Sequence, residues 1–454
     1  MQKSARRIAL DILGSTNGPP GLSCDLKRLD ERDRALVKEL VLGVERWKRF
    51  LDYYASFFCH RPVQRLSPKV LNGIRLGVYQ MVFMGIPSYA AINSMVQCMG
   101  SKGERGFVNG VLRSISRNPG HVELPSLDTE IISYAAIRYS YPDWIVERYL
   151  RSFGLKDAIS LLKSQNSPRP VTLRVNTARV DRDSLLKMFQ ANGYDAWPGS
   201  LDISIKVDKG RGVEQFPGYD EGLFVVQDEA AIIPTLALDP CPGDVVWDVC
   251  AAPGGKATHI AERVSQDGLV VASDIDSERA GMITRSCARL GLNNVATVAL
   301  DATGPGEVEA AFKKRGLPLM YDKILVDPPC SGLGVIGKNP DIKWLRRESD
   351  IPKMARRQAR ILETARLFLR PGGCLVYSTC TLTHEENEDV WGCFVKKHGF
   401  AAALDSKRLF PSGDSRMPNA SGGGYMYLLP HIHGTDGFFI ARGLFEPGEK
   451  GKFP

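Results

Sequence analysis

Apolar residues recur every three or four positions through the first quarter of the chain. One run within residues 29–58 places five of them on a single helix face: Leu36, Leu40, Val44, Trp47 and Leu51. Three further runs of the same kind follow, and Asn118, Pro119 and Gly120 end the last one. This pattern predicts an all-α bundle, to which we assign residues 1–125.

The pattern changes over residues 126–220. A strand-like run, VTLRVN, is followed by the helical segment DRDSLLKMFQANG and by the alternating run ISIKV. This order of strand, helix and strand predicts a small α+β subdomain that links the two ends of the chain.

Residues 221–443 contain five continuous apolar runs of strand length, separated by helical segments. The runs are VVWDVCAA, LVVASDID, VATVALDA, KILVDPP and CLVYSTC, and GFFIAR at 437–442 predicts a final strand. Continuous apolar runs indicate strands that are buried on both faces. The pattern therefore predicts a Rossmann-like α/β domain with a mostly parallel sheet, followed by a tail at 444–454.

The positive charge of the chain is concentrated at one end. The net charge is +8, and residues 1–120 hold 19 Lys and Arg against 9 Asp and Glu. A basic domain beside a neutral one suits a grip on nucleic acid, although a solvated basic surface would give the same count. No signal peptide and no apolar span of about 20 residues is found, so we expect a cytoplasmic protein without a membrane partner.

Ten cysteines are scattered along the chain. They form no CxxC pair and no Cys/His set with zinc spacing, so we expect no metal site and no disulfide framework. Most are predicted to be small buried hydrophobic residues. Cys330 and Cys380 differ, because each follows a predicted strand end.

A small-residue loop connects the first strand of the α/β domain to its helix. The loop comprises Cys250, Ala251, Ala252, Pro253, Gly254, Gly255 and Lys256. Its small residues let a ligand approach the backbone, and the helix N-terminus suits a carboxylate. Asp274 and Asp301 end the next two strands and suit a ribose and a base. The loop is neither GxGxxG nor a P-loop, so it favours a cofactor with one ribose, one base and an amino acid carboxylate over a structural glycine turn.

Three motifs in the α/β domain resemble those of a known family. DVCAAPGGKATH, VDPPCSGLGVIGKNPDIKW and VYSTCTLTHEENEDV resemble the NOL1/NOP2/Sun family of RNA cytosine-C5 methyltransferases, and the helical front end resembles the antitermination factor NusB. The resemblance covers nearly the whole chain. It implies that the residues from Cys250 to Lys256, together with Asp274, Asp301 and Asp327, contact S-adenosylmethionine. It also implies that the substrate is 16S ribosomal RNA.

Methylation at carbon 5 of cytosine requires a nucleophilic thiolate that adds to carbon 6. Strand-end position leaves Cys330 and Cys380 as equal candidates, and the Pro-Cys order used by DNA cytosine methyltransferases favours Cys330. The family resemblance implies instead that Cys380 is the nucleophile and that Cys330 assists product release. In this scheme Asp327 holds the cytosine, and Lys256 adds positive potential near the thiolate.

Four alternatives to this function remain, and two features after Cys330 could contact RNA. DPPC resembles the D/N-P-P-Y/F tetrad of amino-methyltransferases but lacks its stacking aromatic. A non-catalytic NusB-like RNA-binding or antitermination factor, a tRNA methyltransferase and a pair of buried core thiols are the others. A helix after Cys330 carries a stripe of Lys353, Arg357 and Arg360 that suits phosphates. Trp344 either stacks on a base or belongs to the core.

The target cytosine has to be unpaired or flipped out of a helix to reach a buried thiol. We expect the protein to be a monomer.

Overall fold

The computed structural model describes residues 3–15, 26, 29–118, 120, 122–208, 212–409 and 424–446. The chain forms two compact units. The first, here called the helical unit, comprises Met1–Ser167 and Ile336–Arg346, and the second, the sheet unit, comprises Pro168–Val335 and Arg347–Pro454.

The helical unit is built from α-helices, as the periodicity predicts. Its helices are α1 (Ala5–Gly14), α2 (Glu31–Ser56), α3 (Pro68–Val82), α4 (Ser88–Cys98), α5 (Lys102–Arg117), α6 (Ile131–Arg138), α7 (Asp143–Asn166) and α13 (Ile342–Leu345), with a 3₁₀ turn at Val63–Arg65. Side chains cap several N-termini. Ser67, for example, accepts a hydrogen bond from the backbone of Val70, and Ser101 forms a capping box with Glu104.

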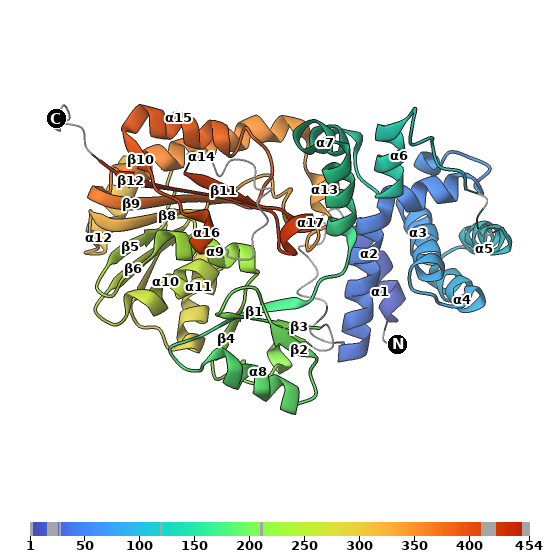
Figure 1. Cartoon of the computed structure of the whole chain (residues 1–454). Coiled ribbons are helices and arrows are strands. Elements are labelled where there is room, and N and C mark those ends of the chain that lie inside the picture. Colours follow the sequence, from blue (N-terminus) through green and yellow to red (C-terminus); the bar gives the residue numbers. More distant parts are fainter. Residues whose placement is uncertain are drawn as a thin grey trace. The chain divides into compact units, whose positions relative to one another are not determined.

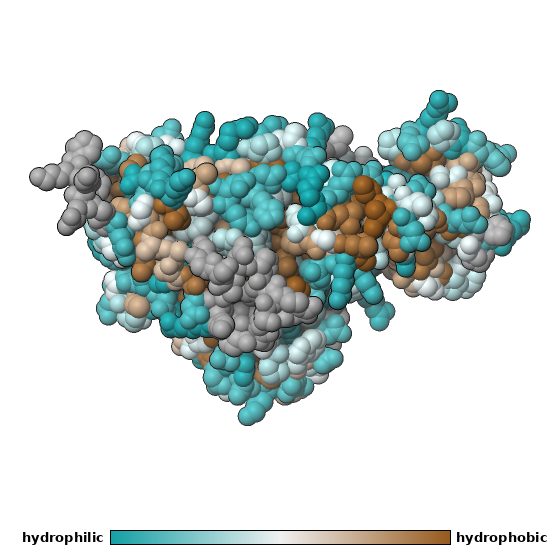
Figure 2. All heavy atoms as spheres, turned by 45° about the horizontal axis from the view of Figure 1, so that its top comes forward, coloured by the Kyte–Doolittle hydropathy of each residue, from teal (hydrophilic) through white to brown (hydrophobic). Residues whose placement is uncertain are grey.

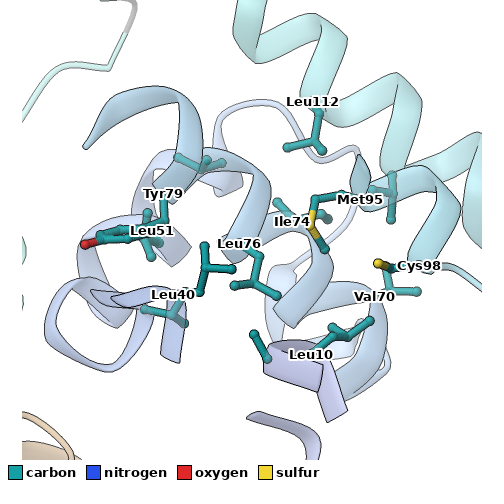
Figure 3. Packing of buried hydrophobic residues seen from close by; sticks show 14 of the residues in the cluster. Leu10, Leu40, Leu51, Val70, Ile74, Leu76, Tyr79, Met95, Cys98 and Leu112 are labelled. Carbon is teal, nitrogen blue, oxygen red and sulfur yellow. The ribbon is translucent and has the colours of Figure 1, made fainter. Parts of the chain in front are cut away.

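The core of the helical unit lies between α1 to α5. Figure 3 shows Leu40 of α2 beside Leu76 of α3, and Ile74 of α3 beside Met95 of α4. These four side chains are fully buried. Helices α2 and α3 approach closely at Gly43, where a Cβ atom would lie 2.0 Å from the ring of Tyr79. Any larger residue at position 43 would therefore push α3 away from α2.

Residues 336–346 belong to the helical unit although they directly follow the segment that contains Cys330. The indole N–H of Trp344 donates to the carbonyl of Glu45 over 2.7 Å. The ammonium group of Lys343 is fully buried and donates to the carbonyls of Arg46 and Ser140 and to the side-chain oxygen of Asn166. Trp344 is partly buried, and its indole N–H is engaged by the backbone of α2.

The sheet unit begins with a small antiparallel sheet and a helix. Its strands, in the order β2-β3-β1-β4, are β1 (Val171–Val175), β2 (Ala196–Pro198), β3 (Ser204–Val207) and β4 (Phe224–Val226), with α8 (Arg182–Ala191) packed beside them. Leu173, Phe189 and Phe224 form much of its buried core. The expected α+β subdomain is therefore present.

A second sheet of eight strands dominates this unit. Its path is β10-β12-β9-β8-β5-β6-β7, and β11 pairs with β12. The strands are β5 (Val245–Asp248), β6 (Leu269–Asp274), β7 (Val295–Ala299), β8 (Tyr321–Val326), β9 (Leu369–Thr379), β10 (Phe400–Ala402), β11 (Tyr425–Leu428) and β12 (Phe438–Phe445). The five strands from β9 to β7 are parallel, and the other three join the sheet through antiparallel pairs that involve β12. The predicted mostly parallel sheet is confirmed.

Helices cover both faces of the large sheet. The elements α9 (Glu229–Leu238), α10 (Gly255–Val264) and α11 (Ser277–Leu290) lie on one face, and α14 (Ile351–Arg366) and α15 (Glu388–His398) lie on the other (Figure 1). The remaining helices are α12 (Pro305–Lys314), α16 (Ser406–Leu409) and α17 (Pro430–His433), with 3₁₀ turns at Val213–Gln215 and Glu348–Asp350. The order of the strands reverses direction between β5 and β8. Such a switch point, at the carboxyl ends of the strands, is where α/β sheets bind ligands.

The surface of the protein is largely polar, and its last strand extends close to the end of the chain. Hydrophilic residues cover most of the surface seen in Figure 2. None of the described helices is long and apolar enough to cross a membrane. Strand β12 continues to Phe445, which lies inside the segment assigned to a tail, and residues 447–454 of that segment lie outside the described residues.

Candidate active site

The loop from Cys250 to Lys256 lies at the switch point of the large sheet. Its backbone is tied to the neighbouring strand, because the N–H of Ala251 donates to the carbonyl of Ser273 over 2.8 Å. Gly254 has φ 109°, and a Cβ atom there would lie 3.2 Å from the Cα of Ile283. Helix α10 then begins at Gly255 without a side-chain cap. Its first N–H groups are therefore available to an anionic ligand group.

Asp248 ends β5 directly beneath this loop. The side chain is fully buried, and neither carboxylate oxygen has a hydrogen-bond partner among the described residues. Burial raises its pKa to about 7; the Lys256 cation opposes this rise, while Asp327 and Asp274 add to it. An orphaned carboxylate is costly in a protein interior. A bound cationic group, or a water molecule held with it, would satisfy these oxygens.

The two predicted strand-end acids also lie at this edge of the sheet. Asp274 ends β6 with its side chain almost buried, accepts from the N–H of Asp276 and lies 3.5 Å from Arg279. Asp301 follows β7 and accepts from the N–H of Thr303. The register of β6 and β7 pairs Asp274 with Ala299, so the two acids follow neighbouring parallel strands. The loop and both acids therefore share the carboxyl edge.

Lys256 and Asp327 join the loop to the end of β8. The ammonium Nζ of Lys256 donates to Asp327 Oδ2 over 2.5 Å, and the hydroxyl of Ser378 donates to Oδ1 over 3.0 Å. Burial alone would lower the pKa of Lys256, but the attraction of Asp327 and Asp248 outweighs burial and raises it. Lys256 is therefore a fixed cation at neutral pH. Its Nζ also lies 5.4 Å from the centre of the Phe438 ring.

Cys330 and Cys380 meet beyond the ends of β8 and β9. Their Sγ atoms lie 3.2 Å apart, and either sulfur can donate. The hydrogen bond to Cys380 and burial raise the pKa of Cys330 well above its ordinary value. Cys330 is therefore a thiol that ionises less readily than usual and lies against a second sulfur. Cys250 lies near the carboxylates, where burial and Asp248 raise its pKa, so it is not an activated thiol.

The described residues hold other groups that sequence reasoning missed. Asp248, Ser378 and Glu386 all lie within the three motifs, but no pattern in the sequence assigns them a role. Ser378 donates to Asp327, and Glu386 accepts from the backbone of Ser331, which follows Cys330. On α14, Lys353 and Arg360 are exposed while Ile361 and Ala365 are buried, as expected for a basic outer face. No group of three or more His, Cys, Asp or Glu within the described ranges could hold a metal ion.

Three families match successive parts of the chain. Residues 4–117 match the NusB family, and residues 141–214 match a ferredoxin-like domain of the RsmF/B methyltransferases. Residues 235–444 match the family described as 16S rRNA methyltransferase RsmB/F. The NusB match explains the all-α front end, and the ferredoxin-like match agrees with the small antiparallel sheet.

Curated proteins and solved structures extend these matches. The probable ribosomal RNA small subunit methyltransferase B of Bacillus subtilis (strain 168) is 35% identical over 420 residues, covering 91% of this chain and 90% of that protein. The ribosomal RNA small subunit methyltransferase B of Erwinia tasmaniensis is 33% identical over 92% of this chain and 91% of its own length. The crystal structure of NSun6 from Pyrococcus horikoshii with SFG is 25% identical, with a TM-score of 0.56 over 68% of this chain and 99% of that chain. A methyltransferase homologue from the same organism is 28% identical, with a TM-score of 0.59 over 70% and 99% of the two chains. Because residues 235–444 match the RsmB/F family and the similarity to the small subunit methyltransferases covers more than 90% of this chain, the chain belongs to the RsmB/F family of ribosomal RNA methyltransferases.

Proposed function

We propose that this protein transfers a methyl group from S-adenosylmethionine to carbon 5 of a cytosine in 16S ribosomal RNA. One observation carries the proposal. The sulfur atoms of Cys330 and Cys380 lie 3.2 Å apart at the carboxyl ends of neighbouring parallel strands, next to the Lys256–Asp327 pair. Two thiols at one ligand-binding edge suit a reaction that needs both a nucleophile and a proton carrier.

The proposed chemistry starts from the poor nucleophilicity of carbon 5. The thiolate of Cys380 adds to carbon 6 of the cytosine, and the ring becomes an enamine that is nucleophilic at carbon 5. When bound, S-adenosylmethionine supplies the methyl group on a sulfonium. A base then removes the proton from carbon 5, and the electrons of that C–H bond restore the 5,6 double bond as the Cys380 thiolate leaves.

The surroundings of the two sulfurs support this division of roles. The hydrogen bond to Cys380 and burial raise the pKa of Cys330, so one sulfur of the pair can stay protonated and donate to the other. Cys380 is the more exposed of the two. Cys380 is among the groups that raise the pKa of Lys256, so the ammonium lies close to this sulfur. We therefore assign Cys380 as nucleophile and Cys330 as the group that assists release.

Asp327 is proposed to hold the cytosine at N3 and N4. Each of its carboxylate oxygens accepts one hydrogen bond from the protein, and each retains a second lone pair. An oxygen fixed by Lys256 on one side is well placed to accept from a protonated ring nitrogen or an amino group on another. This interaction would favour the electron-poor ring that accepts a thiolate.

The cofactor proposal rests on residues that fit its separate groups. The uncapped start of α10 suits the methionine carboxylate, and the orphaned Asp248 suits a cationic group. Asp274 suits the ribose hydroxyls and Asp301 suits the adenine amino group, with Asp327 at the edge of the same site. The close approach at Gly254 leaves the backbone accessible.

The RNA would be held mainly by positive charge. Residues 1–120 carry a net charge of +10, and we propose that residues 1–125 form the RNA-binding domain, 126–220 the linking subdomain and 221–443 the catalytic domain. The exposed face of α14 with Lys353 and Arg360 would add phosphate contacts beside the two cysteines. Because a stacked base cannot reach a thiol beyond a strand end, the target cytosine is unpaired or flipped out.

A methyl-transfer assay tests the proposal. The full chain is incubated with tritium-labelled S-adenosylmethionine and unmodified transcripts of 16S ribosomal RNA or tRNA, and bisulfite sequencing locates the product. We expect label in 16S transcripts at one cytosine and none in tRNA. A non-catalytic RNA-binding factor would bind RNA without transferring label. Preferential labelling of tRNA would favour the tRNA alternative.

A further inference from the structure

Glu386 lies in the turn between β9 and α15, and its carboxylate is fully buried. Its hydrogen-bond partners among the described residues are neutral donors, which compensate for its burial. Oε1 accepts from the N–H of Ser331 over 2.8 Å and from Gln358 Nε2 over 3.0 Å. Oε2 accepts from the hydroxyls of Thr383 and Ser331. Four donors therefore converge on this one carboxylate.

Most of these donors belong to segments that carry the two cysteines. Ser331 directly follows Cys330, and Gln358 also donates to the carbonyl of Pro329, which precedes it, over 3.0 Å. Glu386 thus reaches the backbone on both sides of Cys330. The hydroxyl of Ser331 also lies 2.6 Å from that of Thr381, the residue after Cys380. The carboxylate therefore connects the two cysteine segments.

The pairing of β8 with β9 does not reach the two cysteines, although β12 pairs with Thr379 directly before Cys380. The ladder between β8 and β9 ends at the pair Val326 and Tyr377, so both cysteines lie beyond the last paired residues. One backbone bond joins the segments there, from the N–H of Gly334 to the carbonyl of Cys380 over 2.9 Å. The hydroxyl of Tyr377 donates to the carbonyl of Glu386 over 2.5 Å, which anchors the turn to β9.

We propose that Glu386 is a positioning residue that holds the Cys330 segment against the Cys380 segment and so sets the approach of the two thiols. The assignment of chemistry to these thiols rests on the proposed function. The positioning role rests on the hydrogen bonds alone. The negative charge of Glu386 also contributes, after the Cys380 hydrogen bond and burial, to the raised pKa of Cys330. It therefore helps to keep Cys330 a thiol.

Disulfide trapping tests the positioning without relying on catalysis. The full chain is treated with diamide, and the rate of Cys330–Cys380 disulfide formation is followed by peptide mass spectrometry. In Glu386→Gln, one carboxylate oxygen becomes an NH2 group. In one orientation this group faces the N–H donors of Ser331 and Gln358, and in the other it replaces the oxygen that accepts from the hydroxyls of Thr383 and Ser331. We expect this variant to form the disulfide about tenfold more slowly, because the segments lose their shared anchor and their effective concentration falls. Loss of the Glu386 charge alone would ease ionisation of Cys330 and speed the reaction, so a slower rate reports the lost anchor.

Glu229→Gln is the matched control. Glu229 is equally buried, accepts from Leu201 and Ser204 and pairs with Lys206, all in or beside the small sheet. This variant should lose comparable thermal stability and keep the wild-type disulfide rate. An unchanged rate in folded Glu386→Gln overturns the proposal. If that variant does not fold, Ser331→Ala decides by the same assay, with a rate about threefold lower expected and an unchanged rate again contradicting the positioning role.

Methyl transfer provides a second measurement. We expect Glu386→Gln to lower kcat about tenfold or more and to change KM for RNA by less than about twofold, because the RNA-binding surface is intact. Glu386→Asp keeps the charge but is one methylene shorter, so it should restore part of the disulfide rate and part of kcat. A wild-type protein without methyl-transfer activity would contradict the proposed function, while the disulfide rates would still decide the positioning role.

Discussion

Cys330 Sγ lies 3.2 Å from Cys380 Sγ, although 50 residues separate them in the chain. Parallel pairing of β8 and β9 brings both segments to the same edge of the sheet. At this distance a thiolate on one residue can accept a hydrogen bond from the thiol of the other. A substitution of either cysteine therefore removes one role and leaves the other measurable.

The two alanine variants should fail at different steps. Cys380→Ala is expected to transfer no methyl group and to form no covalent RNA adduct, because the attacking sulfur is gone. Cys330→Ala should accumulate a denaturation-resistant RNA adduct, because elimination lacks its assisting group. Denaturing gel electrophoresis of labelled RNA measures the adduct, and Cys393→Ala on the exposed surface of α15 is the control. The reverse pattern would show that the roles are exchanged.

Removing the ammonium of Lys256 should slow methyl transfer by about 100-fold. In Lys256→Met, Asp327 loses its 2.5 Å partner, and the nearby buried Asp248 loses its cation. Single-turnover tritium transfer is the measurement, and Lys396→Met on the exposed face of α15 is the control. If the Lys256 variant keeps wild-type transfer, the cation has no part in holding the base or favouring the thiolate.

Asp248 should make the cofactor-free protein less stable as pH rises. Its ordinary pKa is 3.8 and burial raises the folded value to about 7. A raised folded pKa means that the folded state binds the proton more tightly, so this stability is present below about pH 4 and is lost as pH rises to about 7. Full loss corresponds to no more than about 4 kcal/mol.

Thermal denaturation at pH 5 and pH 8 tests this sign. Asp248→Asn stays neutral, so its Tm should fall less than that of the wild type between the two pH values, and it should be the more stable protein at pH 8. Asp267→Asn, on an exposed turn, should follow the wild type. A parallel fall in all three proteins would mean that Asp248 is not the group responsible.

The sequence was informative where a local pattern is tied to a strand end. Periodicity locates β5, β8 and β9, and their ends carry Asp248, Asp327 and Cys380, so the edge of the sheet could be predicted. The Glu386 network could not, because its donors come from separate segments whose approach depends on side-chain packing. No local pattern distinguishes a carboxylate that accepts four hydrogen bonds from one that faces water.

Lys343 shows the same limit in the helical unit. The run of basic residues after Cys330 suggested contacts with phosphate, and Lys353 on α14 is indeed exposed. Lys343 stands in the same run but is fully buried. Its acceptors are contributed by residues about 180 to 300 positions earlier in the chain, so charge in the sequence does not reveal its burial.

Replacing Lys343 should therefore destabilise the helical unit. Lys343→Met would leave the carbonyls of Arg46 and Ser140 and the side chain of Asn166 without this donor, and it would remove an amino group that lies 3.7 Å from the centre of the Tyr141 ring. Burial lowers the pKa of Lys343 well below its ordinary value, so the main loss is of these hydrogen bonds. We expect a loss of about 2–5 kcal/mol in the free energy of unfolding, measured by urea denaturation. Lys396→Met should change it by less than about 0.5 kcal/mol, because that side chain is exposed. A Lys343 variant as stable as the control would mean that these three acceptors find other partners, and that the segment at 336–346 is held in the helical unit by Trp344 and its apolar neighbours alone.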